Sequence, residues 1–415
     1  MSSNHGREPV STEWRRRSVL AGGAALALAG RSRRARAASS VRIGVLSDMS
    51  GPYSANAGQG SVIGARLAIE DFRRDNPGMD VDLIEGDFQN KADIGSALAR
   101  DWMDTKGVTA FVDVVASSVA FTVADLVREK NKVALFTAPA TGDLTAARCS
   151  PNHVHWVYDT WALANGTGRS LVEQGKKSWF FLTADYAFGH SLQDDTAGIV
   201  KAAGGTVLGA AQVPFPGTTD FSSFLLQAQA SGAQVIGLAN AGTDTVNCIK
   251  QAAEFGISRT QQLAGLLFQI ADVHAIGLQQ AQGLVLTEAF YWDLNDGTRA
   301  FSARVAPQLR GQKPSMLHAG AYSAVLHYLR AVKAVGSAED GRRVVEQMKA
   351  MPTDDPLFGR GSVRADGRVI HDMYLFQVKS PADSKGPWDY YTLRQTIPTA
   401  AAFRPIDPAC KMVRA

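Results

Sequence analysis

Short apolar runs alternate with longer segments of helical periodicity along most of the chain, beginning at residue 41. Runs that are apolar at successive positions and rich in β-branched residues predict strands that are buried on both faces. We predict strands at 41–46, 81–86, 110–115, 133–137, 178–183, 206–212, 235–239 and 284–289.

Helical periods fill the intervals between these runs. Ile94, Leu98 and Trp102, for example, stand four residues apart and so share one face of a helix. Strands that alternate with helices predict parallel sheets covered by helices on both faces, a doubly wound α/β fold. The pattern starts again near Trp179, which predicts two similar lobes. After residue 289 it changes to two helices, 300–309 and 318–334, and short strands near 361–363 and 373–379.

The first 37 residues have the features of an export signal. Basic residues 15–17 precede an apolar run and then Ala35-Arg36-Ala37, a cleavage pattern. The run is about ten residues long, too short to span a bilayer. Residues 16–20, Arg-Arg-Ser-Val-Leu, resemble the twin-arginine signal, so we expect a periplasmic protein exported by that route, with the general secretory route as the alternative.

Removal of this segment changes the charge of the protein. The whole sequence has 43 basic and 39 acidic residues, and residues 1–37 hold eight of the basic and two of the acidic ones. The exported chain therefore carries 35 basic and 37 acidic residues, a balance that gives no indication of nucleic-acid binding. After residue 37 no apolar stretch reaches the roughly twenty residues that a transmembrane helix needs.

Three cysteines remain after export, in a compartment where disulfides persist. Cys149 precedes Ser-Pro and Cys410 follows Asp-Pro-Ala, so both belong in loops, whereas Cys248 falls in a helical pattern. We predict a disulfide between Cys149 and Cys410. His153 and His155 alternate along an extended segment but have no third ligand nearby, so we expect no metal site.

The sequence offers no motif for catalysis or for a cofactor. It has no nucleophile elbow and no phosphate-binding loop, and the spacing of Gly58, Gly60 and Gly64 does not fit a dinucleotide fingerprint. Residues 185–191 hold an Asp, a His and a Ser within one short turn, where a catalytic relay is hard to form. We therefore expect a binding protein with no catalytic residue and no cofactor.

Six segments stand out in order along the exported chain. They are Ser-Asp-Met-Ser-Gly-Pro-Tyr at 47–53, Gly-Ala-Arg-Leu-Ala-Ile-Glu-Asp at 64–71, Val-Ala-Ser-Ser at 115–118, Ala-Pro-Ala-Thr at 138–141, Asp-Tyr-Ala-Phe-Gly at 185–189 and Gln-Ala-Ala-Glu-Phe-Gly at 251–256. Together they resemble the periplasmic solute-binding proteins of ABC importers, of the branched-chain amino-acid (leucine-isoleucine-valine) receptor type. The resemblance covers essentially the whole exported chain.

This resemblance implies two Rossmann-like lobes joined by three crossovers near Asp159, Ala289 and Ile370, with the ligand in the cleft between them. Lobe I would comprise residues 41–158 and 290–369, lobe II residues 159–289 and 370–400, and residues 401–415 would form a C-terminal tail. Such a receptor closes on a small solute and docks on the permease subunits of the importer; we expect it to act as a monomer.

The predicted carboxylate site lies where two strands of the first lobe end. Ser117 and Ser118 follow an apolar strand and begin a helix, so their hydroxyls and free backbone N–H groups suit an anion. Ala140 and Thr141, after the next strand, resemble the family's pair that adds a backbone N–H and a hydroxyl. We also place Asn56, in the loop before the first helix, among the ligand-binding residues.

The resemblance assigns further ligand-binding residues to the second lobe: Asp185, Tyr186, Phe188, Asn240, Ala241 and Leu267. Leu267 occupies the position at which amino-acid receptors usually carry a Glu that pairs with the ligand ammonium. A buried ammonium without a carboxylate partner costs several kcal/mol. We therefore predict a small organic carboxylate as the ligand. We expect Phe268, Tyr291 and Trp292 near the cleft, which favours an aromatic ligand.

Other interpretations stay open at this point. A shift of two positions would bring Gln269 to the site in place of Leu267, and Asp185, Asp244 or Asp272 could supply the missing acid. The protein would then be a receptor for branched-chain amino acids or amides. From other classes, a periplasmic sensor that regulates a membrane kinase or an operon, and a periplasmic enzyme, are the alternatives.

Overall fold

The first of two parallel sheets is built from the N-terminal third of the chain. The computed structural model describes residues 41–413, so the predicted export signal lies outside the described residues. Five strands run in the order β2-β1-β3-β4-β5. They are β1 (Val41–Ser47), β2 (Val81–Asp87), β3 (Ala110–Asp113), β4 (Val133–Phe136) and β5 (His153–His155). The register pairs Ile43 of β1 with Ala110 of β3.

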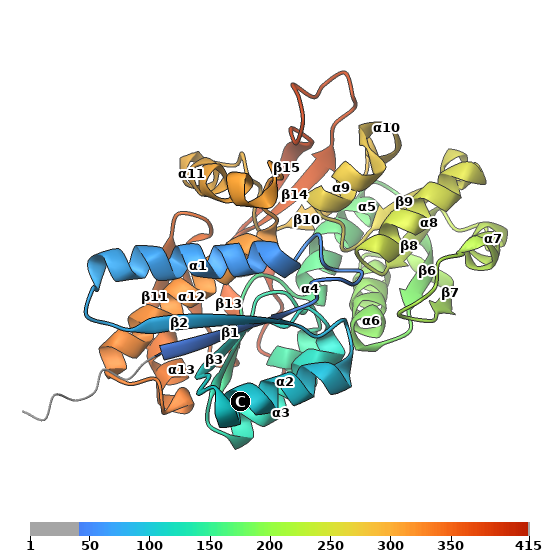
Figure 1. Cartoon of the computed structure of the whole chain (residues 1–415). Coiled ribbons are helices and arrows are strands. Elements are labelled where there is room, and N and C mark those ends of the chain that lie inside the picture. The colour runs from blue at the N-terminus through green and yellow to red at the C-terminus, as the bar shows by residue number, and fades with distance from the viewer. Residues whose placement is uncertain (1–40, 414–415) are drawn as a thin grey trace, which may run out of the picture. The chain divides into compact units, whose positions relative to one another are not determined.

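Helices cover both faces of this first sheet, as the apolar strands require. Helices α1 (Gly58–Asp75) and α12 (Met316–Val335) lie on one face, and α2 (Ala92–Thr105) and α3 (Ser117–Glu129) on the other (Figure 1). Helices α1 and α12 touch closely because Gly64 has no side chain: a Cβ there would lie 2.3 Å from the His318 carbonyl oxygen. Helix α12 thus returns to the first lobe from late in the sequence.

The second lobe repeats this architecture. Its four parallel strands run in the order β7-β6-β8-β9 and are β6 (Ser178–Ala184), β7 (Thr206–Val213), β8 (Val235–Ala239) and β9 (Gln262–Gly265). Its helices are α4 (Thr160–Leu163), α5 (Arg169–Glu173), α6 (Ala187–Ala202), α7 (Ser222–Ala230), α8 (Thr243–Glu254), α9 (Ile270–Ile276) and α10 (Leu278–Ala281).

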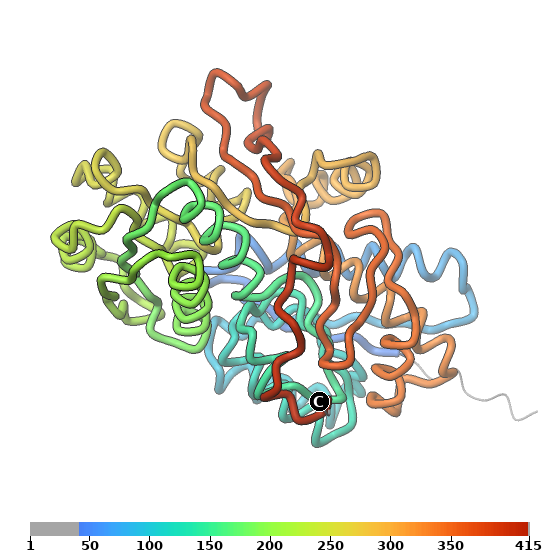
Figure 2. Tube along the Cα trace, turned by 180° about the vertical axis from the view of Figure 1, so that it is seen from behind, coloured from blue at the N-terminus to red at the C-terminus, as the bar shows by residue number. Residues whose placement is uncertain are grey.

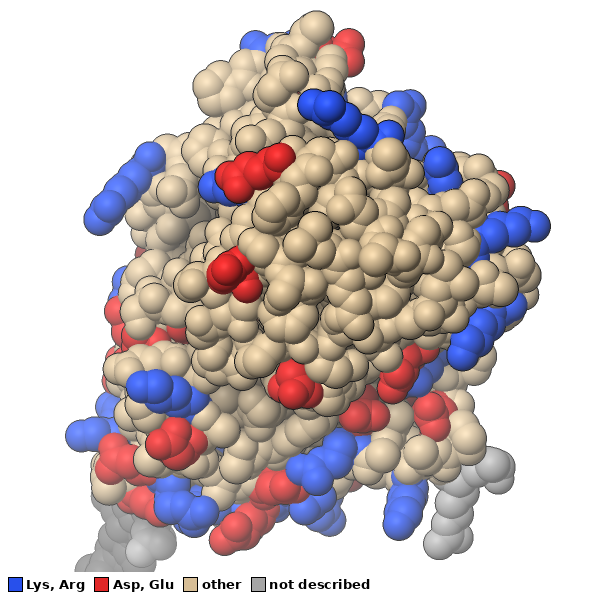
Figure 3. All heavy atoms as spheres, turned by 90° about the vertical axis from the view of Figure 1, so that its right-hand side faces the viewer, with Lys and Arg blue, Asp and Glu red and all other residues tan. Residues whose placement is uncertain are grey.

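Between residues 202 and 243 Asp220 is the one charged residue, and the face over α7 and α8 shows few charged side chains (Figure 3).

Two antiparallel sheets complete the fold. Strand β10 (Val285–Glu288) pairs with β14 (Met373–Val378), which pairs with β15 (Tyr391–Ile397). Helices α11 (Asp296–Val305) and α13 (Gly341–Ala350) accompany α12 in the first lobe, beside the small sheet of β11 (Pro352–Asp355), β12 (Gly359–Val363) and β13 (Val369–Ile370). The predicted doubly wound, two-lobed α/β fold is confirmed.

The C-terminal segment follows β15 across the back of the described part of the chain (Figure 2). It contains α14 (Thr399–Ala402) and ends at a disulfide between Cys410 and Cys149, whose Cα atoms are 5.6 Å apart. Cys248 is free and buried in α8. Among the described residues, no helix is long and apolar enough to cross a membrane.

Candidate ligand-binding site

A small cavity of about 20 Å³ lies at the carboxyl ends of strands from both parallel sheets, the place where open α/β sheets gather ligands. Its lining residues are Tyr53, Asn56, Val115, Ala138, Ala140, Tyr158, Tyr186, Phe188, Ala241, Leu267, Gln269 and Leu317. No Asp, Glu, Lys, Arg or His is among these described lining residues. The cavity therefore offers a ligand apolar surface, neutral hydrogen-bonding groups and no formal charge.

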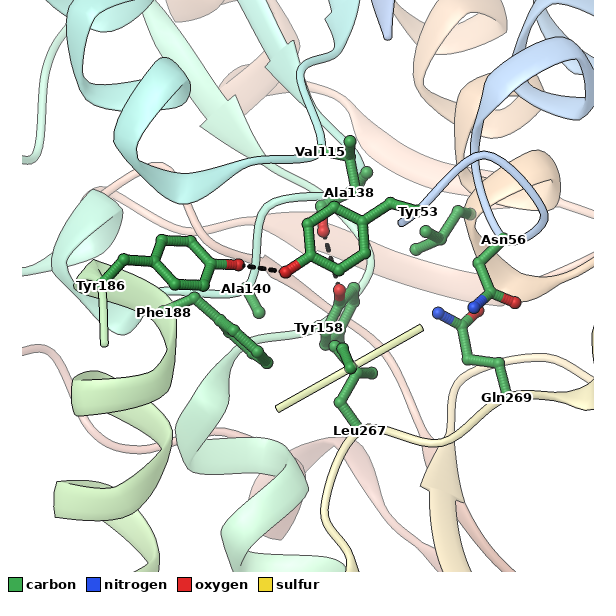
Figure 4. Close-up of a pocket in the computed structure, with 12 residues that line it drawn as sticks. Tyr53, Asn56, Val115, Ala138, Ala140, Tyr158, Tyr186, Phe188, Leu267 and Gln269 are labelled. Atoms are coloured by element: carbon green, nitrogen blue, oxygen red, sulfur yellow. Dashed lines mark hydrogen bonds between the residues drawn. The ribbon is translucent and has the colours of Figure 1, made fainter. Parts of the chain in front are cut away.

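Two tyrosines close one side of the cavity. The Tyr53 and Tyr186 hydroxyls lie 2.5 Å apart (Figure 4) and come from different lobes. Phe215 stacks on the Tyr186 ring, with centroids 4.5 Å apart. Burial raises the pKa of both phenols, so both carry a proton. Because two hydroxyls share one hydrogen bond, one hydroxyl hydrogen stays free to reach a ligand oxygen.

The middle of the cavity is apolar. Tyr158 lines it with its ring, since its hydroxyl donates to the Ala138 carbonyl at 2.7 Å. Phe188, near the start of α6, and Leu267, in the loop after β9, are both buried and face the same space (Figure 4). These side chains suit a flat apolar ligand body.

The opposite side of the cavity carries two amides. Asn56, before α1, donates from Nδ2 to both oxygens of Asp272 at 3.0 and 3.1 Å, and the Gln269 backbone N–H donates to Asp272 at 2.9 Å. Burial raises the pKa of Asp272 to about 6. Asp272 is held by these hydrogen bonds from Asn56 and Gln269, and it does not line the cavity.

The predicted carboxylate site is brought together in part. Ser117 begins α3, and its hydroxyl oxygen accepts from the Thr141 backbone N–H at 3.4 Å. Both residues are buried and do not line the cavity, whereas Ala140 does. The structure does not bring Ser118 to the site, because the side chain lies on the exposed face of α3.

The second-lobe predictions divide in the same way. Tyr186, Phe188, Ala241 and Leu267 line the cavity. Asn240 does not, because its side-chain oxygen accepts from the Thr245 hydroxyl at 2.7 Å and supports the loop from within. Nor does Asp185, whose half-exposed carboxylate binds His190 at 2.9 Å.

The expected position of three aromatic residues is wrong. Phe268 packs in the core of the second lobe, and Tyr291 and Trp292 line a separate surface hollow with Lys379 and Phe376. Tyr291 and Trp292 are directed there because both donate to the Trp388 carbonyl. The aromatic character of the cavity comes instead from Tyr53, Tyr158, Tyr186 and Phe188.

Several lining residues were missed. Three of them, Tyr53, Val115 and Ala138, belong to the segments that carry the family resemblance. Tyr158 directly precedes the first crossover. These positions in the sequence could have identified all four as lining residues. No feature of the sequence indicates Leu317, because its helix α12 returns to the site some 160 residues after the first crossover. The alternative with a shift of two positions predicts Gln269 in place of Leu267, and the structure places both at the cavity.

The third of the candidate acids, after Asp185 and Asp272, does not supply the missing charge either. Asp244, in the first turn of α8, is buried, and its Oδ2 has no hydrogen-bond partner among the described residues. Burial raises the pKa of Asp244 to about 7, which favours its neutral form, and its side chain does not line the cavity.

Comparison with known proteins agrees with this geometry. Residues 40–386 match the family described as periplasmic binding protein. The chain belongs to this family. A periplasmic binding protein from Burkholderia mallei is 47% identical to it, with a TM-score of 0.87, over 91% of this chain and 100% of that one. No curated protein matches the sequence.

Two further solved structures carry names that mention transport. A branched-chain amino-acid ABC transporter periplasmic ligand-binding protein from Burkholderia xenovorans is 38% identical to this chain, with a TM-score of 0.78, over 89% of this chain and 100% of that one. A solute-binding protein of an ABC transporter from R. palustris, solved with 4-hydroxybenzoate, shares the fold at 22% identity and a TM-score of 0.78, over 87% and 97% of the two chains. The predicted family and the role as a solute receptor of the ABC-transporter type are confirmed.

Proposed function

We propose that this binding protein captures a small organic carboxylate with an aromatic body in the periplasm and delivers it to the permease of an ABC importer. One observation carries the choice of ligand: four aromatic rings and no charged side chain line the cavity. An amino acid would bury its ammonium there without a carboxylate partner, at a cost of several kcal/mol.

A carboxylate has neutral partners at the Tyr53 and Ala140 side of the cavity. The free hydroxyl hydrogen of the Tyr53–Tyr186 pair is one donor. Ser117 lies at the N-terminus of α3, a 13-residue helix whose dipole favours negative charge at this end. We infer that the anion lies against Ala140 in the first lobe, with Ser117 and Thr141 supporting this wall of the cavity, while Tyr186 and Phe188 cover the anion from the second lobe.

The relatives support both the proposed ligand class and its main rival. The R. palustris protein shows that this fold can enclose a hydroxylated aromatic acid. The Burkholderia xenovorans protein is described by branched-chain amino acids, which makes an amino acid the competing ligand. The uncharged lining of the cavity favours an aromatic acid as the ligand of this chain.

A thermal-shift panel tests the proposal with the purified protein lacking residues 1–37. We expect benzoate and substituted benzoates to raise the melting temperature by several degrees, whereas leucine, isoleucine, valine and phenylalanine leave it unchanged. Stabilisation by the amino acids alone would overturn the proposed ligand class and leave the receptor role intact.

The proposal includes the export route and the assembly of the receptor. We infer that residues 16–20 direct twin-arginine export and that the exported protein works as a monomer. Replacement of Arg16 and Arg17 by Lys should leave precursor in the cytoplasm, as measured by cell fractionation, and light scattering should report one copy. Unimpaired export of the Arg16→Lys, Arg17→Lys variant would favour the general secretory route.

A further inference from the structure

The amide of Gln269 is a lining group whose chemistry the aromatic carboxylate leaves unused. Gln269 is 3% exposed and lines the cavity. Its backbone N–H binds the Asp272 carboxylate, and its side chain faces the Asp272 backbone N–H in the capping box of α9, but its side-chain oxygen makes no hydrogen bond of normal geometry among the described residues. A buried amide that stays unpaired is unfavourable, so such a group is rare unless a ligand or a water satisfies it.

The neighbouring Asn56 shows the same feature and fixes the local geometry. Its Nδ2 binds the Asp272 carboxylate, which assigns the nitrogen end of this amide, and its Oδ1 has no partner among the described residues. Figure 4 shows the two amides side by side on one side of the cavity, with Ala140, Tyr186 and Phe188 on the opposite side. The unpaired polar groups therefore lie away from the proposed carboxylate site.

We propose that Gln269 selects ligands that carry an uncharged hydrogen-bonding substituent, such as a hydroxyl, on the side of the ring opposite the carboxylate. This inference rests on the proposed function and names its substrate class more closely. A neutral amide offers both a donor and an acceptor, so it can pair with a hydroxyl in either direction. It cannot neutralise an ammonium, which agrees with the absence of charge from the described lining residues.

The expected selectivity follows from the cost of an unsatisfied partner. A methyl group and a hydroxyl have nearly the same size, but a methyl group would cover the Gln269 amide without a hydrogen bond. Loss of one buried hydrogen bond of this kind corresponds to about tenfold to a hundredfold in affinity. Discrimination between size-matched ligands therefore reports on the amide and not on the volume of the cavity.

The test is isothermal titration of the protein without residues 1–37 with benzoate, 4-methylbenzoate and 4-hydroxybenzoate. We expect 4-hydroxybenzoate to bind at least tenfold more tightly than 4-methylbenzoate. In Gln269→Leu this ratio should fall to about one or reverse.

Gln261→Leu is the matched control. Gln261 is a buried glutamine of the same lobe, and its amide donates to the carbonyls of Ala228 and Ala233 away from the cavity. This variant should lose stability but keep the ratio between the hydroxyl and methyl ligands. If Gln269→Leu does not fold, the ratio in the wild type still decides.

Each result has a separate meaning. Equal binding of 4-hydroxybenzoate and 4-methylbenzoate by the wild type would overturn the role of Gln269 and leave the proposed function standing. Failure of all three benzoates to bind would instead remove the proposed function on which the inference rests. A ratio that persists in Gln269→Leu would also overturn the inference.

Discussion

The phenol oxygens of Tyr53 and Tyr186 lie 2.5 Å apart and join the loop before α1 to the start of α6. A second link connects the same loop to α9, from Asn56 to Asp272. Both links cross from one lobe to the other at the rim of the cavity, so the structure represents a closed receptor. Closure by hinge motion is the movement by which two-lobed receptors enclose a solute.

Tyr53→Phe should weaken ligand binding. It removes the link between the two hydroxyls and one of the two phenols that we assign to the ligand carboxylate, and a single hydrogen bond of this kind contributes about 0.5–1.5 kcal/mol. We expect the Kd for benzoate to rise by about two- to tenfold in isothermal titration. Tyr291→Phe, whose hydroxyl binds the Trp388 carbonyl outside the cavity, should leave Kd unchanged. Wild-type affinity in Tyr53→Phe would contradict the role of the pair.

Leu267→Glu should abolish high-affinity binding of benzoate. The new carboxylate would lie at a buried, apolar position of the cavity wall and would repel an anionic ligand. We expect a loss of at least tenfold in affinity, whereas Leu267→Met, which conserves volume, should stay within a few-fold of the wild type. Unchanged benzoate affinity in Leu267→Glu would place the ligand elsewhere.

Removal of the disulfide should lower stability without loss of the fold. The bond joins residues separated by 261 positions and fastens the C-terminal segment, which also binds Asn165 and Arg364 through its backbone. Bonds of this kind contribute about 2–4 kcal/mol. The Cys149→Ser, Cys410→Ser variant should unfold at lower urea concentration, and a reductant should destabilise the wild type but not this variant. A reductant effect that persists in the variant would contradict the assignment.

The contribution of Glu288 to stability should fall as pH rises from about 5 to about 8. Burial raises the pKa of Glu288 to about 8, although the Tyr391 hydroxyl donates to its carboxylate at 2.7 Å. The folded protein therefore holds a proton that the unfolded chain has released above pH 4.5, the ordinary value. The contribution of this group is complete below that pH and is lost as pH rises through 8, at about 1.4 kcal/mol per pKa unit.

Glu288→Gln should flatten this pH dependence because it cannot ionise and keeps an acceptor for Tyr391. Urea unfolding at pH 5, 6.5 and 8 measures the slope. Glu254→Gln, at an exposed position near the end of α8, is the control and should keep the wild-type slope. A slope in Glu288→Gln as steep as in the wild type would show that other groups cause the decline.

The strands of the parallel sheets were largely predictable from sequence, and the short edge elements were not. Residues 43–46 and 235–239 are buried on both faces, so their apolar runs predict strands directly. Strand β5 contains His153 and His155, whose polar rings are buried. Hydrogen bonds to the carbonyls of Leu144 and Pro139 satisfy one nitrogen of each ring. Those partners come from tertiary structure, which periodicity along the sequence does not reveal.

The site was predictable only where a residue ends a strand or belongs to a family segment. Ala140 and Phe188 meet that condition. Asp185 meets it too, yet its side chain points outward to His190, because the direction of a side chain depends on the local turn. Leu317 lies beyond such reasoning, since its helix reaches the cavity through the packing of α12 on α1.

The most direct test of the account compares ligands that differ only by an ammonium group. Isothermal titration of the protein without residues 1–37 with 3-phenylpropanoate and L-phenylalanine, and with 4-methylpentanoate and L-leucine, isolates this one group. If the cavity binds a carboxylate but has no partner for an ammonium, each acid should bind at least a hundredfold more tightly than its amino acid. Tighter binding of the amino acids would contradict the central claim.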